Sequence, residues 1–360
     1  MRNPLLIIDI IIGQEGPLVP EFKQLGNVLV YKSHQKNISQ LSYKKWLTHR
    51  LDFLFESLFG QKEKPANIKD FLNKNYDCVF SNTITNGKIL NQLQLGHCKV
   101  ITYVHELENA IRRFTTLKDL ASTLKHTTHF LVPSNAVAHN LITKYQVNEN
   151  KISTLNYYIP TVDVPQKRLN EIRKELNIEE SLIVCGAGTC DWRKGADIFL
   201  QVAIQILKNH PSISVKFLWI GADKTSEDYL HLAHDAKMAG VQEDVIFLDS
   251  VVNPLDYMSL MDVFLLTSRE DPYPLVVLEA SMLRKPTICF EKSGGAVEFV
   301  SKAKGGIVSY LNTKEMSELL LELLSQQELR EHLGREAYDV FNNLHSEAVT
   351  APVLESFLCP

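Results

Sequence analysis

The sequence predicts an α/β protein built from two doubly wound domains. Short apolar runs alternate with helix-length amphipathic segments, in two series separated by a proline-containing stretch. Such alternation is typical of β-α-β units with parallel strands, and two series imply two domains. The expected strands are 5–12, 27–31, 77–81, 99–104, 129–133 and 151–155 in the first series, and 182–188, 215–221, 244–249, 262–267, 286–290 and 305–311 in the second.

The boundary between the two series lies in "NYYIPTVDVPQKRLNE", residues 156–171. Pro160 and Pro165 interrupt regular structure there, and a charged helix is expected after them. We therefore expect a first domain over 1–160 and a second over 168–343.

The composition excludes several classes of protein. The 360 residues are 45% hydrophobic and 22% charged, and the formal net charge of −4 gives no reason to expect nucleic-acid binding. The six cysteines lack the spacing of a zinc site, so we expect reduced thiols, no metal and a cytoplasmic protein. No stretch approaches the roughly 20 apolar residues that cross a bilayer. Asp9 interrupts the first apolar run, which favours a strand over a signal peptide.

Residues 41–63, "LSYKKWLTHRLDFLFESLFGQKE", combine cations with an apolar face. A basic amphipathic helix can lie on an anionic membrane, which would place the protein peripherally on the inner face of the membrane. Ordinary surface helices show the same pattern, so packing against the first sheet is the alternative.

The segment "TSREDPYPLVVLEASMLRKPTICFEKSGGAVEFV", from residue 267 to residue 300, begins with acids at a strand end. The strand 262–267 runs directly into a loop that carries Glu270 and Asp271. Open parallel sheets bind ligands at the carboxyl ends of their strands. The two acids are therefore candidates for ligand contact.

Glu279 follows in a nearly apolar helix. Pro272 and Pro274 hold the preceding loop extended, and the helix is expected to begin near Leu275. The helix neighbours of Glu279 at three and four residues are all apolar and cannot pair with a carboxylate. A buried carboxylate without a partner is costly, so Glu279 needs a donor from a neighbouring loop or from a ligand.

A second candidate site lies in "LIVCGAGTCDWRKGADIFLQVAIQIL", residues 182–207. A strand runs into a glycine-rich turn that includes Gly188, and Arg193 and Lys194 precede a helix. Cations beside a helix N-terminus are suited to a diphosphate, and they would stabilise the charge on a leaving nucleoside diphosphate. Two solvated cations are the alternative. A dinucleotide fingerprint is a weaker interpretation, because Asp191 occupies the place of its third glycine.

Two further features follow strands. His105 comes directly after the strand 99–104, where a histidine either supports the fold or meets a ligand. Gly294 and Gly295 follow the strand 286–290, and glycines allow a close backbone approach to an anion or a sugar.

The pattern "SREDPYPLVVLEA…P…GGAVEFV" resembles the signature of retaining glycosyltransferases with the GT-B fold, particularly family 4. Members carry an acid, seven residues, then Glu, followed by a Gly-Gly loop with another Glu. Asp271 falls at the first acidic position, where Glu is usual, and Glu270 is the neighbour that could compensate. The "KG" at Lys194 and the "HEL" at His105 are also similar to the family.

The resemblance implies a set of donor-binding roles. Glu279 would hold the ribose hydroxyls of the nucleotide, Asp271 and His105 would face the donor sugar, and Arg193 with Lys194 would bind the diphosphate. Arg193 would replace an arginine that the family carries earlier in the turn, where this chain has Thr189. The expected donor-binding set also includes Gly188, Glu270, Pro274, Leu275, Gly294 and Gly295.

The resemblance also implies an architecture. Two Rossmann-like domains would face each other across a cleft, and a helix near 346–360 would cross back to the first domain. The chain begins at what would be the family's second strand, so we expect the first domain to lack its usual first β-α unit.

The implied reaction moves a sugar from a nucleotide sugar to a glycan or lipid-linked acceptor with retention (EC 2.4). No Asp-x-Asp motif is present to hold a metal, so we expect a metal-independent enzyme without a cofactor. The alternatives are an inactive GT-B scaffold or partner protein, and a sugar-nucleotide epimerase of the same fold.

Overall fold

The computed structural model describes residues 7–13, 15–31, 68–178 and 180–358. The predicted helix at 41–63 lies outside these residues. By its contacts the chain divides into two compact units, Met1–Asp77 with Ile89–Cys98 and Cys78–Lys88 with Lys99–Pro360. Each unit is described by itself.

The first unit holds a two-stranded parallel sheet. Its elements are β1 (Asp9–Ile12), α1 (Val19–Leu25), β2 (Asn27–Val30) and α3 (Ile68–Leu72). Asp9, which interrupts the apolar run, accepts a hydrogen bond from Asn27 at 2.8 Å and pairs with Lys74. The strand expected here is therefore present. The expected absence of a first β-α unit stays a prediction.

The second unit contains a four-stranded sheet of order β3-β4-β5-β6, in which every pair is parallel. Buried residues of α5, α6 and α7, among them Ile111, Leu120 and Leu141, form a core with Phe130 on one face of this sheet. The elements are β3 (Cys78–Ser81), η1 (Ile84–Asn86), α4 (Gly87–Leu90), β4 (Lys99–Tyr103), α5 (Glu108–Phe114), α6 (Leu117–His126), β5 (His129–Val132), α7 (Asn135–Tyr145), η2 (Glu149–Lys151) and β6 (Ile152–Thr154).

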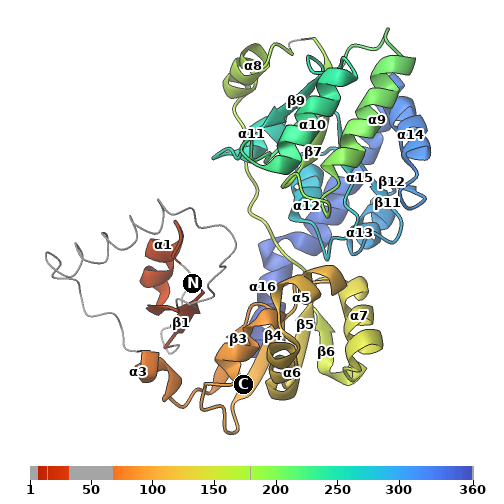
Figure 1. Cartoon of the computed structure of the whole chain (residues 1–360). Coiled ribbons are helices and arrows are strands. Elements are labelled where there is room, and N and C mark those ends of the chain that lie inside the picture. The colour runs from red at the N-terminus through yellow and green to blue at the C-terminus, as the bar shows by residue number, and fades with distance from the viewer. Residues whose placement is uncertain (1–6, 14, 32–67, 179, 359–360) are drawn as a thin grey trace, which may run out of the picture. The chain divides into compact units, whose positions relative to one another are not determined.

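The same unit contains a six-stranded parallel sheet of order β12-β11-β10-β7-β8-β9 (Figure 1). This is the strand order of a doubly wound nucleotide-binding domain, so the predicted fold class is confirmed. The elements are α8 (Gln166–Glu175), β7 (Leu182–Ala187), α9 (Ala196–Asn209), β8 (Val215–Ile220), α10 (Glu227–Met238), β9 (Val245–Leu248), α11 (Pro254–Met258), β10 (Val263–Leu266), α12 (Leu275–Met282), β11 (Thr287–Phe290), α13 (Ala296–Lys302), β12 (Gly306–Val308), α14 (Thr313–Ser325), α15 (Gln327–His345) and α16 (Glu347–Leu358).

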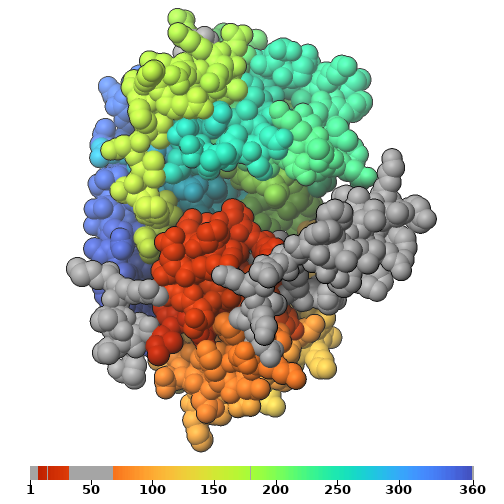
Figure 2. Space-filling model, turned by 90° about the vertical axis from the view of Figure 1, so that its left-hand side faces the viewer, coloured from red at the N-terminus to blue at the C-terminus, as the bar shows by residue number. Residues whose placement is uncertain are grey.

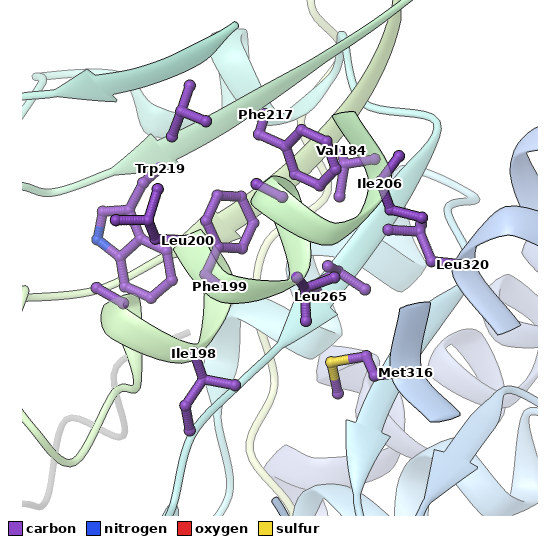
Figure 3. Close-up of a cluster of buried hydrophobic side chains, with 14 of the residues drawn as sticks. Val184, Ile198, Phe199, Leu200, Ile206, Phe217, Trp219, Leu265, Met316 and Leu320 are labelled. Atoms are coloured by element: carbon purple, nitrogen blue, oxygen red, sulfur yellow. The ribbon is translucent and has the colours of Figure 1, made fainter. Parts of the chain in front are cut away.

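Separate cores cover the two faces of the six-stranded sheet. On one face, Phe199 of α9 lies edge-on to Phe217 and Trp219 of β8, with ring centroids 5.7 and 5.2 Å apart (Figure 3). Helices α10 and α14 complete this core, while α12, α13 and α15 pack on the other face. Truncating a buried phenylalanine of this kind costs about 3–5 kcal/mol. The cores hold rigid the strand ends that carry the candidate site.

The linker 155–165 and the junction of α15 with α16 connect the two sheets of the second unit. In Figures 1 and 2 the linker (yellow-green) runs beside the C-terminal helices (blue). Helix α16 returns to the four-stranded sheet, where Leu354 and Phe357 pack against Ile101 and Leu131. These connections explain why the contacts group both sheets in one unit. The domain limits of 1–160 and 168–343 stay a prediction.

Candidate functional site

The loops that follow β7 and β10 lie side by side in the centre of the six-stranded sheet. The chain winds outward in opposite directions from these two strands, and doubly wound folds bind their ligands at this point. The loops are joined by the backbone N–H of Arg269, which donates to the carbonyl of Arg193 at 2.8 Å. The structure therefore brings the turn at 188–195 and the acidic loop at 267–274 together.

Both predicted cations converge on one carboxylate. Lys194 Nζ lies 2.6 Å from Asp271 Oδ2, and Arg193 Nη1 lies 3.6 Å from the same oxygen. Asp271 is only 4% exposed, so these cations supply the partner that a buried charge requires. A Cβ on Gly188 would come within 2.9 Å of Lys194 Cγ, so the glycine gives the lysine stem its path.

Glu270 has a different partner. Both carboxylate oxygens accept a hydrogen bond from the backbone N–H of Asn109, at 3.1 and 3.2 Å, in the first turn of α5. Burial raises the pKa of Glu270, while the backbone N–H groups and the charge of Arg193 oppose that shift. The carboxylate thus caps a helix of the four-stranded sheet's domain, and Asp271 is the acid that faces the cations.

Unlike Glu270 and Asp271, Glu279 has no polar partner among the described residues. It lies in α12, which has Pro274 as its N-cap and Leu275 as its first residue, as predicted. The side chain is half-buried, and among the described residues it makes no hydrogen bond or ion pair. Burial alone raises the pKa of its carboxyl group. No described loop supplies a donor to Glu279, and its predicted contact with a ligand stays a prediction.

The glycine pair packs against the acidic loop. The N–H of Gly295 donates to the carbonyl of Asp271 at 3.0 Å. A Cβ on Gly294, whose φ is +122°, would lie 2.0 Å from that carbonyl oxygen, and one on Gly295 would lie 2.1 Å from the carbonyl oxygen of Pro272. The close approach that these glycines permit is therefore to the protein's own backbone. Their predicted contact with the donor stays a prediction.

His105 is held through both ring nitrogens. Nδ1 hydrogen-bonds with the hydroxyl of Tyr157, and Nε2 lies 2.7 Å from Asn82 Oδ1. Burial lowers the pKa of His105 from 6.5 to about 4, so the ring is neutral at neutral pH. Because neither nitrogen is free, the ring can bind a sugar hydroxyl only by exchanging one of these partners.

Several residues of this region were not predicted from the sequence. Arg269 binds both carboxylate oxygens of Asp197 in α9, at 2.9 and 2.6 Å, and donates to the carbonyl of Trp192. Tyr157 and Asn82 hold His105. Two of these residues could have been suspected from the sequence, because Arg269 precedes two loop acids and Asn82 follows a strand. Nothing in the local sequence indicates a role for Tyr157.

Two structural observations concern other kinds of site. Over residues 7–13, 15–31, 68–178 and 180–358, no group of three or more His, Cys, Asp and Glu side chains could hold a metal ion. No helix in this part of the chain is long and apolar enough to cross a membrane.

Solved structures with the same architecture span almost the whole chain. Anabaena Alr3699/HepE, in complex with UDP and glucose, gives a TM-score of 0.76 at 15% identity and covers 98% of this chain and 92% of that one. WaaG, a glycosyltransferase involved in lipopolysaccharide biosynthesis, gives 0.67 at 13% identity and covers 98% and 100%. The chain has the GT-B fold. Its two Rossmann-like domains are those of this fold.

A family model and several curated proteins match part of the chain. Residues 168–340 match the family described as Glycosyl transferases group 1. Spore coat protein SA of Bacillus subtilis (strain 168) is 30% identical over 179 residues, 47% of this chain and 46% of that protein. The O-antigen biosynthesis glycosyltransferase WclY of Escherichia coli is 27% identical over 237 residues, 63% of this chain and 64% of that protein.

A third relative, the capsular polysaccharide biosynthesis glycosyltransferase CapM of Staphylococcus aureus, is 24% identical over 241 residues, 64% of this chain and 60% of that protein. The chain thus spans less than two thirds of the length of each of these curated relatives. The family match thus covers residues 168–340, and the likeness of fold extends over almost the whole chain.

Proposed function

We propose that this GT-B chain transfers a sugar from a nucleoside diphosphate sugar to a glycan or lipid-linked acceptor. The observation that carries the proposal is the carboxylate of Glu279, which is half-buried in α12, the helix after β10, and has no partner among the described residues. Two neighbouring ribose hydroxyls would each donate a hydrogen bond to this group, and bonds to a charged acceptor are among the stronger ones. The burial of Glu279 would then be satisfied when the donor binds.

The cations supply the second part of the proposed donor site. Arg193 and Lys194 lie at the turn before α9, where a diphosphate would meet two positive charges and a helix N-terminus. In the free protein they neutralise Asp271. A bound diphosphate would share these cations, and Asp271 would become free to accept a hydrogen bond from the donor sugar. Gly188 would give the turn room for this exchange.

The proposed reaction breaks the bond between the anomeric carbon and the diphosphate oxygen and forms one to the acceptor oxygen. The cations would stabilise the departing diphosphate, which would take the proton of the acceptor hydroxyl. We assign retention and independence from metal ions to the reaction as parts of the proposal. No protein nucleophile is assigned.

The similar proteins support this class of donor and acceptor. HepE was solved with UDP and glucose, and WclY and CapM are described as enzymes of O-antigen and capsular polysaccharide biosynthesis. By this proposal the chain acts in cell-envelope polysaccharide assembly. It would do so at the cytoplasmic side of the membrane, with 41–63 as a candidate for peripheral contact.

Calorimetric titration with UDP, GDP, ADP and dTDP sugars tests the proposal. We expect the wild type to bind one of these donors, and Glu279→Gln to weaken that binding about tenfold or more, since it removes charge-assisted hydrogen bonds. Glu322→Gln, at an exposed position of α14, is the matched control and should bind as the wild type does. If the protein binds none of these donors, the proposed enzymatic activity is refuted and the inactive scaffold is favoured. Donor turnover without an acceptor would favour an epimerase.

A further inference from the structure

The two chain segments that connect the sheets of the second unit are hydrogen-bonded to each other. Asn156 Nδ2 in the linker donates to the carbonyl of Leu344 at 3.2 Å, and His345 Nδ1 lies 2.7 Å from the carbonyl oxygen of Tyr157. A carbonyl only accepts, so His345 carries its proton on Nδ1. Its Nε2 then accepts from the hydroxyl of Tyr273, 3.0 Å away. Residue 157 is therefore fixed at its backbone.

The side chain of Tyr157 points from this junction to His105. The two rings are stacked, with centroids 5.5 Å apart and planes at 18°, and the Tyr157 hydroxyl meets His105 Nδ1. The Tyr157 ring also meets Tyr273 of the acidic loop edge-on, with ring centroids 6.0 Å apart. One linker residue thus contacts both the histidine and the loop of the proposed donor site.

The hydrogen bonds of His105 define where its proton lies. Asn82 Oδ1 can only accept, so the ring proton lies on Nε2, and Nδ1 accepts the hydrogen of the Tyr157 hydroxyl. Burial, together with the charges of Glu106 and Asp271, raises the pKa of Tyr157, which keeps the phenol protonated. Nε2–H donates to Asn82 Oδ1, 2.7 Å away, while the protonated phenol donates to Nδ1.

We propose that Tyr157 is a positioning residue that fixes the Nε2–H tautomer of His105 and orients its ring. The proposal rests on the proposed function, in which His105 meets the donor sugar. Nε2–H would then exchange Asn82 for a sugar hydroxyl oxygen and donate to it. A tautomer that is set beforehand presents a donor without rearrangement, and such preorganisation favours binding of the reacting group.

The tautomer is measured by nitrogen-15 NMR of the imidazole groups, with His105→Gln assigning the resonances. The wild type should show Nε2–H. To isolate the tyrosine, the experiment starts from Asn82→Ala, in which Tyr157 is the one described residue still hydrogen-bonded to the ring. This variant should keep Nε2–H, whereas adding Tyr157→Phe should populate both tautomers. As a control, Tyr158→Phe makes the same chemical change at the next residue, which is exposed. Adding it to Asn82→Ala instead should leave the tautomer of His105 unchanged.

Three results would overturn the proposal. The first is an Nδ1–H tautomer of His105 in the wild type, which can be detected without any variant. The second is a mixture of tautomers already in Asn82→Ala, and the third is an unchanged tautomer when Tyr157→Phe is added to that variant. These measurements need no donor. If no nucleotide sugar binds, the proposed function fails and the tautomer result still decides the role of Tyr157.

Kinetics separate a positioning role from a purely structural one. With the donor found by titration, Tyr157→Phe should lower kcat/KM about tenfold, the order expected for one lost hydrogen bond, with the loss mainly in kcat. Tyr158→Phe should match the wild type. If both variants turn over the donor equally well, the inference fails while the proposed function stands.

Discussion

We expect the protein to lose stability in mild acid through one buried histidine. His345 is fully buried, and burial lowers its pKa from 6.5 to about 4, with the charge of Lys302 adding to the shift and the Tyr157 carbonyl opposing it. The unfolded chain binds the proton first, so the stabilisation is complete above pH 6.5 and is lost as the pH falls toward the folded value. The loss is about 2 kcal/mol between about pH 7.5 and about pH 5.

Urea unfolding of the wild type and of His345→Gln at these two pH values measures the effect. Glutamine does not titrate and can still donate to a carbonyl, so the variant should lose about 2 kcal/mol less than the wild type over this interval. Contributions from His105 and from buried acids are common to both proteins and cancel. His234→Gln, at an exposed position of α10, should behave as the wild type. Equal losses in the wild type and His345→Gln would refute the reasoning.

Three further changes test the loops of the candidate site. Lys194→Met should destabilise the protein by about 3 kcal/mol in urea unfolding, because it leaves a buried carboxylate short of its nearest cation. Adding Asp271→Asn should restore most of the loss, and a double variant no more stable than the single one would argue against the ion pair. Gly294→Ala places a Cβ 2.0 Å from a carbonyl oxygen and should cost about 1–3 kcal/mol, whereas Gly13→Ala, with open space around it, should cost far less. Glu270→Ala should speed amide hydrogen exchange at the start of α5 about tenfold, and an unchanged rate would contradict the capping role.

The strands and the edge that carries the site could be predicted because both depend on local pattern. Buried parallel strands are short apolar runs, and the expected strands at 262–267 and 286–290 correspond to β10 and β11. The chain direction then fixes which loops lie at the carboxyl ends. For this reason the turn with Lys194 and the loop with Asp271 could be assigned to one edge before the sheet order was known.

The partners of the site residues could not be predicted, because they depend on segments distant in sequence. Glu270 caps a helix 161 residues earlier in the chain, and Tyr157 binds His105 across 52 residues. No spacing or composition signals such pairs, since each depends on how two elements approach in space. The glycine pair shows the same limit. The sequence predicts that these glycines allow a close backbone approach. It does not predict that the carbonyl groups of Asp271 and Pro272 are the groups that approach them.

Three of the five acids in the 267–300 segment, Glu270, Asp271 and Glu279, are distinguished by their partners. Glu270 is bound by backbone N–H groups and Asp271 by cations, so the fold alone satisfies both. Glu279 has no such partner among the described residues, and burial raises the pKa of its carboxyl group. Glu279→Gln should therefore leave the free protein as stable as the wild type or more so in urea unfolding, while it weakens donor binding. A clear loss of stability would show that the fold itself uses the carboxylate, and the argument that Glu279 awaits a ligand would fail.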